Sequence, residues 1–148
     1  MFTRSYRAIL GAALLLAAPA LLADNSTKVP GYTIHHNVVT TDVLNPTIAN
    51  TYGIRRSKNR AMLNVSVIQD EPGKAGHSVA ADVTVVAKNI MGQPRDLTMR
   101  EIREGDAVYY ISDFLVSNRE RLKFDLSVKP AGSDEVFSAT ISQEFYTD

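Results

Sequence analysis

Apolar and polar residues alternate in short runs along most of the chain after residue 30, and turn-forming residues separate the runs. The most regular run spans 122–129, where every second residue is apolar: Leu122, Phe124, Leu126 and Val128. Strict alternation is the pattern of a strand that has one face in the core and the other in water. We therefore expect these four side chains to be buried and the intervening Lys123, Asp125 and Lys129 to be exposed.

The same pattern predicts six further strands. Runs 61–68 and 78–88 flank the turn residues 70–73, and we interpret them as a hairpin. Run 107–116 is apolar on both faces, which predicts a strand covered on each side. Run 95–103 changes its apolar face before Ile102, which indicates a bulge or an edge strand. The two remaining runs are 32–40 and 137–145.

Seven short strands in about 120 residues are typical of an immunoglobulin-like sandwich, in which two antiparallel sheets pack face to face. We therefore expect an all-β fold of this kind, with a small closed β-barrel as the alternative. One segment departs from the β pattern, because Asn45 is a good N-cap, Pro46 suits a first helical position and Gly53 suits a C-terminal one. These residues predict a short helix over 46–52, which we expect to cross between strands of different sheets.

The N-terminus has the order of a secretory signal peptide. Arg4 and Arg7 precede a run of small and apolar residues from 8 to 23, and this run is shorter than the about 20 residues that a permanent membrane helix needs. We expect cleavage after Ala23, with Ala20 as the alternative site. The exported product is then a single domain of residues 24–148 in the periplasm, with no transmembrane segment.

Composition excludes several classes of protein. The 148 residues contain 16 Lys and Arg, 16 Asp and Glu and no Cys. A net charge of zero argues against nucleic-acid binding, which normally needs an excess of basic residues. The absence of cysteine excludes disulfides, thiolate metal sites and cysteine nucleophiles. We expect no cofactor.

Three segments together resemble a known family: 31–37 (GYTIHHN), 44–60 (LNPTIANTYGIRRSKNR) and 63–67 (LNVSV). The chain is similar to short exported proteins of gamma-proteobacteria that form domain-of-unknown-function family 4426. The resemblance extends over residues 24–148. It implies a periplasmic β-sandwich and no established activity.

A basic cluster is the candidate binding site: Arg55, Arg56, Lys58 and Arg60. Guanidinium groups suit phosphates and carboxylates, so the cluster is a candidate surface for a partner or a small anion. The alternative is structural, because cations stabilise a helix C-terminus and these side chains can pair with acids at 70–71, 101 or 104. The sequence leaves both interpretations open.

Catalytic and metal chemistry find little support in the sequence. His35 and His36 are adjacent, so on a strand they point to opposite faces and cannot bind one ion together. We expect His36 to be a hydrogen-bonded core residue. Serine-hydrolase, phosphate-loop and zinc-protease motifs are absent. We therefore expect no catalytic or metal site.

The leading hypothesis for function is a non-enzymatic module that binds a periplasmic or envelope protein through a strand edge or through loop 55–60. The alternative is a carrier of a small anionic ligand or envelope component that binds at loop 55–60.

Overall fold

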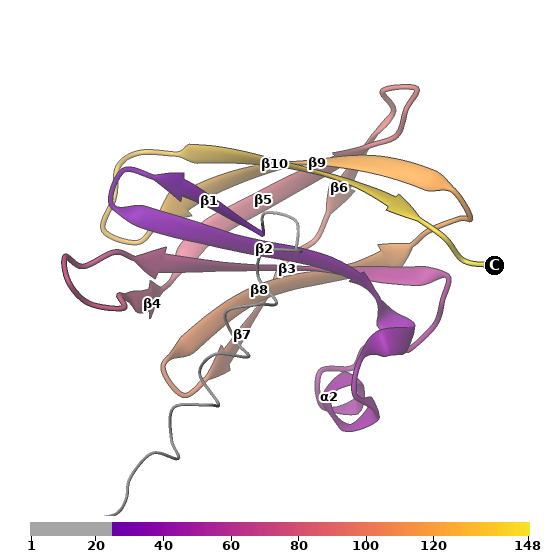
Figure 1. Cartoon of the computed structure of the whole chain (residues 1–148), viewed down its shortest axis with the longest axis horizontal. Helices are drawn as coiled ribbons and strands as arrows, with labels where there is room; N and C mark the ends of the chain where they lie inside the picture. The colour runs from indigo at the N-terminus through magenta and orange to yellow at the C-terminus, as the bar shows by residue number, and fades with distance from the viewer. Residues whose placement is uncertain (1–24) are drawn as a thin grey trace, which may run out of the picture.

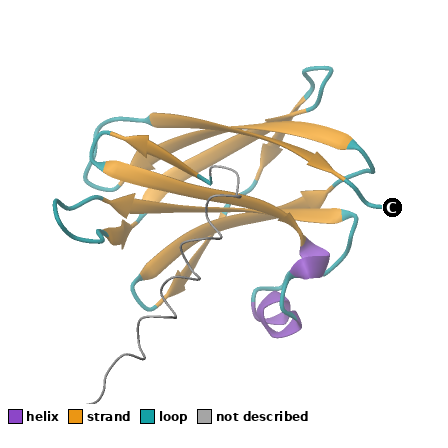
Figure 2. Ribbon diagram, in the orientation of Figure 1, coloured by secondary structure: helices purple, strands orange, loops and turns teal. Residues whose placement is uncertain are grey.

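The computed structural model describes residues 25–148, so the predicted signal peptide lies outside the described part. Two antiparallel sheets pack face to face, as Figures 1 and 2 show. The first sheet contains β1 (Ser26–Val29), β2 (Tyr32–Thr40), β3 (Arg60–Gln69), β4 (His77–Val79), β7 (Arg100–Glu104) and β8 (Ala107–Leu115). The second contains β5 (Ala81–Lys88), β6 (Pro94–Leu97), β9 (Glu120–Pro130) and β10 (Phe137–Phe145). The fold is therefore the predicted sandwich and not a closed barrel.

The strand orders are β1-β2-β3-β8-β7, with β4 also paired to β3, and β10-β9-β5-β6. The core between the sheets is apolar, and in it Phe114 packs against the rings of Phe124 and Phe145. The predicted orientation of β9 is confirmed. Its four alternating apolar side chains are buried, whereas Lys123 and Lys129 are exposed and Asp125 is partly exposed.

The predicted hairpin of 61–68 and 78–88 is wrong in its second half. Of run 78–88, only the first part, β4, pairs with β3. The chain then leaves the first sheet at Ala80, and β5 pairs with β9 and β6 in the second sheet. Hydrogen bonds hold this crossing: Ala81 N–H donates to the Tyr110 hydroxyl at 2.8 Å, and Ala131 N–H donates to the Ala80 carbonyl at 2.8 Å. Alternation continues through the crossing, so the sequence pattern does not mark it.

The irregular run 95–103 crosses between the sheets in the other direction. It forms two edge strands, β6 in the second sheet and β7 in the first, joined by Thr98 and Met99. The expected edge position is confirmed. The change of apolar face before Ile102 arises because the chain changes sheets there.

Strand β8 is covered on both faces, as predicted. Val108, Tyr110 and Phe114 enter the main core, whereas Ile111 and Tyr109 enter a second apolar layer on the outer face of the first sheet. Leu115, at the end of the strand, is exposed. The outer layer therefore needs a cover of its own.

The helix α2 (Pro46–Thr51) supplies this cover, after a short 3-10 turn, η2 (Thr41–Val43). The Asn45 side chain caps it by accepting from the N–H groups of Thr47 and Ile48, and Gly53 has the predicted left-handed conformation (φ 69°). The prediction that this helix crosses between the two sheets is wrong. It joins β2 and β3, which are direct neighbours, and folds back over their sheet.

Truncation of Phe124 tests this assignment of faces. The ring is fully buried, so Phe124→Ala should lower the free energy of unfolding by about 3–5 kcal/mol. Its exposed neighbour is the control, because Lys123→Ala should change the same quantity by less than about 0.5 kcal/mol. Urea denaturation measures both values. Equal losses would contradict the assigned orientation of β9.

Candidate functional site

The structure divides the predicted basic cluster into two pairs. Arg56 and Arg60 make internal contacts. Arg56 donates to the backbone carbonyls of Leu44 and Asp42, both at 2.8 Å, and so fastens the loop to the segment before α2. Arg60 donates two hydrogen bonds to one carboxylate oxygen of Asp113 on β8, at 2.7 and 3.2 Å. Asp113 is not among the acids that the sequence suggested as partners.

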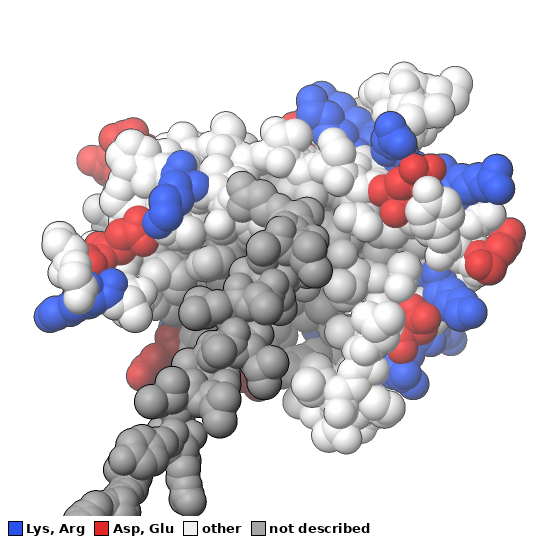
Figure 3. Space-filling model, in the orientation of Figure 1, with Lys and Arg blue, Asp and Glu red and all other residues white. Residues whose placement is uncertain are grey.

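Arg55 and Lys58 are both exposed. No side-chain hydrogen bond or ion pair is recorded for either of them in the part of the chain that the structure describes. Arg56 is exposed as well, but its guanidinium group is engaged by the two backbone carbonyls, so Arg55 and Lys58 are the members of the cluster without an internal contact of this kind among the described residues. On the face that Figure 3 shows, basic and acidic side chains are interspersed rather than separated by sign.

The histidines lie as the alternation predicted. His36 is buried on the core face of β2, and its Nε2 is 3.0 Å from the Thr27 hydroxyl of β1. His35 is exposed on the opposite face. Across residues 25–148, no group of three His, Cys, Asp or Glu side chains is arranged to hold a metal ion.

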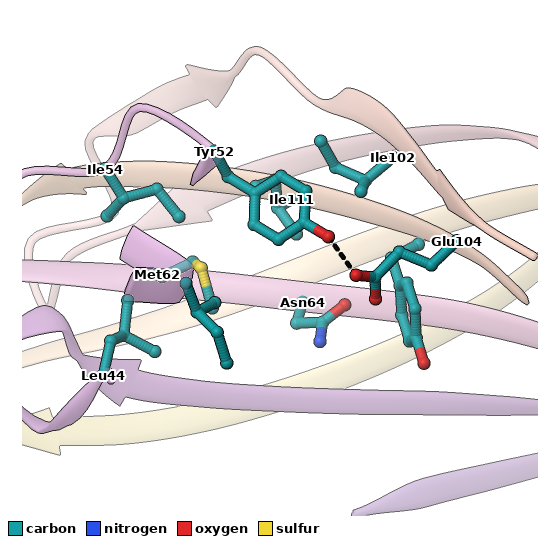
Figure 4. A pocket seen from close by; sticks show the side chains of 10 residues that line it. Leu44, Tyr52, Ile54, Met62, Asn64, Ile102, Glu104 and Ile111 are labelled. Atoms are coloured by element: carbon teal, nitrogen blue, oxygen red, sulfur yellow. Dashed lines mark hydrogen bonds between the residues drawn. The ribbon is translucent and has the colours of Figure 1, made fainter. Parts of the chain in front are cut away.

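A pocket of about 220 Å³ lies beneath α2, on the outer face of the first sheet (Figure 4). Its floor consists of residues from β3, β7 and β8, and its cover consists of α2 and the segments beside it. Most lining side chains are apolar: Leu44, Ile48, Ile54, Met62, Ile102 and Ile111. Tyr52, Tyr109, Asn64 and Glu104 complete the lining.

Asn64 is the polar residue that β3 contributes to the floor of this pocket. Strand register places it between Asn37 of β2 and Ile111 of β8, and Figure 4 shows its side chain between Met62 and Glu104. Its Oδ1 atom is buried and has no hydrogen-bond partner. Such an acceptor destabilises the folded protein unless a donor from a ligand or a water satisfies it.

Tyr52 fastens the cover to β7 at two points. Its hydroxyl donates to the Glu104 carboxylate, and its backbone carbonyl accepts from Arg100 at 2.9 Å. The hydrogen bond to Glu104 is the main cause that raises the pKa of Tyr52 above its ordinary value. The Tyr52–Glu104 pair therefore closes one side of the pocket and places a carboxylate at its rim.

Sequence reasoning missed this pocket. The sequence contained one signal for it. Run 107–116 has a second apolar face, and Met62 lies on the outer face of run 61–68, so both needed a covering layer. The sequence did not indicate that 46–52 provides it, since we expected that helix to lead to the other sheet.

Strand edges differ in how they are protected. The edge strands β1 and β6 have four residues each, β6 begins with Pro94, and β7 carries charges at four of its five positions. The edge strand β10 has nine residues and contains no proline and no basic residue. Short length, proline and charge are the usual barriers to edge pairing. Among the edge strands of the described structure, β10 has the fewest of these barriers.

Solved structures share this fold. A protein of Pseudomonas aeruginosa in the DUF4426 family is 29% identical, with a TM-score of 0.70 over 83% of this chain and 94% of that chain. FetP of a uropathogenic Escherichia coli strain, recombinantly expressed in the periplasm, is 12% identical, with a TM-score of 0.59 over 84% of this chain and 94% of that chain. A copper-bound variant of FetP is 11% identical, with a TM-score of 0.59 over 83% and 95%. At these identities FetP shows likeness of fold alone.

No curated protein matches the chain. Among the described residues, no helix has the length and apolar character to cross a membrane. The model of the family described as domain of unknown function (DUF4426) matches residues 26–148, which is essentially the whole sandwich. The chain therefore belongs to the DUF4426 family, as the resemblance of its sequence indicated.

Proposed function

We propose that this protein is a non-enzymatic periplasmic module that binds an extended segment of a partner protein along β10. The observation that carries the proposal is the length and chemistry of this edge. An edge strand presents unpaired backbone N–H and C=O groups, and an added strand can pair with them in register. Nine residues give room for a complete additional strand.

The side chains of β10 are compatible with such pairing. Ser138, Thr140 and Ser142 are small, polar and exposed, whereas Ala139 and Phe145 are buried in the core. The buried side chains fix the strand to β9, with which it pairs along all nine residues. The edge is therefore held in an extended conformation before a partner arrives, which reduces the entropy cost of binding.

The periplasmic location is part of the proposal. It is supported by the basic and apolar N-terminal segment and by the fold shared with FetP, a protein expressed in that compartment. A strand-pairing edge is an established means of recognition between proteins.

Site-specific photo-crosslinking tests the edge. A photoreactive residue at Ser142 should capture a partner in cells, and the same residue at Ser127 in the central strand β9 should capture far less. Both positions are exposed, so accessibility alone does not separate them. Equal capture from the two positions would contradict edge pairing, and a crosslink only to a second copy of the chain would replace the partner by self-association.

Lysine substitutions on β10 test the same edge by a second route. Introducing Ser138→Lys and Thr140→Lys together should lower capture from Ser142 at least about tenfold, because charge opposes the approach of another strand. The control Ser127→Lys places the same charge on the neighbouring strand and should leave capture within about twofold. Circular dichroism checks that each variant is folded. Unchanged capture by the doubly substituted edge would overturn the proposal.

The second candidate contact is a pair of exposed cations, Arg55 and Lys58, in loop 55–60, which we call the basic loop. It is favoured by their accessibility and by the absence of a recorded ion pair for them in the described residues. The pair would serve a carboxylate or phosphate of a partner or a small anion. Arg56 and Arg60 would then hold the loop in shape and would not touch the ligand.

Charge reversals separate these two roles. Arg60→Glu places an acid beside Asp113 and should lower the free energy of unfolding by about 2 kcal/mol. Lys58→Glu changes an exposed charge and should alter it by less than about 0.5 kcal/mol. Thermal melts at low and high salt measure both. A loss for Lys58→Glu as large as that for Arg60→Glu would show that the exposed pair is structural too.

A further inference from the structure

We propose that the pocket beneath α2 is a binding site for a small, uncharged, mainly apolar molecule that donates one N–H or O–H hydrogen bond to Oδ1 of Asn64. This site is separate from β10 and from the basic loop. The proposal therefore goes beyond the proposed function and does not depend on it.

The size of the pocket limits the ligand. An engineered apolar cavity of about 150 Å³ in another protein accommodates benzene. The volume here is about 220 Å³, which suits a molecule of one or two fused rings or a short alkyl chain. The lining side chains Leu44, Ile54, Met62 and Ile111 favour such a group through burial of apolar surface.

The polar group in the floor adds a requirement for a donor. Asn64 Oδ1 is buried without a partner, and an amide oxygen can only accept a hydrogen bond. A second buried side-chain oxygen without a partner, Oδ1 of Asp42, belongs to η2 and not to the pocket lining. This acceptor is shielded from solvent in the structure, so a ligand donor pairs with it when the Asn64 amide turns toward the pocket. A molecule without a donor gains nothing from that rotation, so the acceptor selects ligands by chemistry.

The rim of the pocket determines which ligand charge is favoured. Glu104 lines the pocket and accepts from the Tyr52 hydroxyl (Figure 4). A carboxylate in this position repels an anionic ligand. In the described part of the chain, the two cations that contact lining residues, Arg100 and Arg56, are engaged by the backbone carbonyls of Tyr52 and Leu44. The pocket is therefore unsuited to the small anions that the basic loop suggested.

Indole and benzofuran are a matched pair of probes. They have nearly the same shape, but indole has an N–H donor where benzofuran has an ether oxygen. Titration of the isotope-labelled protein, followed by NMR, should give a Kd for indole of about 0.1–1 mM, a range expected for a ligand of this size. Resonances of α2, Met62 and Ile111 should shift. Benzofuran should bind about tenfold more weakly, the factor that corresponds to one hydrogen bond.

The variant Asn64→Leu tests the acceptor itself, because leucine keeps the branched shape of the side chain and removes the oxygen. It should weaken indole binding about tenfold and remove the preference for indole over benzofuran. The control Asn37→Leu makes the same change on the neighbouring strand, outside this pocket, and should leave both affinities within about twofold.

Three results would overturn the proposal. The first is that the wild-type protein binds the two probes with equal affinity. The second is that Asn64→Leu still prefers indole. The third is that neither probe shifts the pocket resonances at millimolar concentration. Crosslinking at β10 is measured independently, so failure here leaves the proposed function standing, and the reverse also holds.

Discussion

Burial of the central strands β3 and β8 on both faces is the constraint on which the rest of the structure depends. Their inner faces form the core of the sandwich, and their outer faces carry Met62 and Ile111, which are also buried. A sheet in a two-layer sandwich usually has one face in water. Here part of the outer face needs a third layer, and the segment between β2 and β3 provides it by folding back over its own sheet.

This third layer explains why the candidate sites lie where they do. Helix α2 has six residues and is too small to fill the space above three strands, so a pocket remains beneath it. Arg56 fastens the loop after the helix, Tyr52 fastens the end of the helix to β7, and Arg60 joins β3 to β8. Of the basic cluster, Arg56 thus helps to hold the cover, Arg60 joins two strands of the sheet, and Arg55 and Lys58 face solvent. On the other sheet, β10 has no such cover and keeps an open edge.

Local patterns predicted the elements well, and nonlocal contacts explain what they missed. Alternation located β9 and its buried face, and Asn45 located the start of α2, because both depend on neighbouring residues. The crossing at Ala80 was missed because alternation continues through it. At Thr98–Met99 the apolar face does change, but a local pattern indicates only a bulge or an edge strand and does not show that the chain enters the other sheet. The partner of Arg60 lies 53 residues away, and the position of Asn64 beneath α2 depends on strand register and on a connection that folds back. Neither is encoded in a short motif.

The central claim is that the outer layer contains a pocket with an unsatisfied acceptor at Asn64, retained at a cost in stability. The most direct measurement is the free energy of unfolding of Asn64→Leu without ligand, compared with that of the original chain. Replacing a buried, unpaired polar group by an apolar group of similar shape should raise stability, here by about 1–2 kcal/mol. A decrease of about 1 kcal/mol or more would show that Asn64 makes hydrogen bonds on which the fold depends, and would contradict the account.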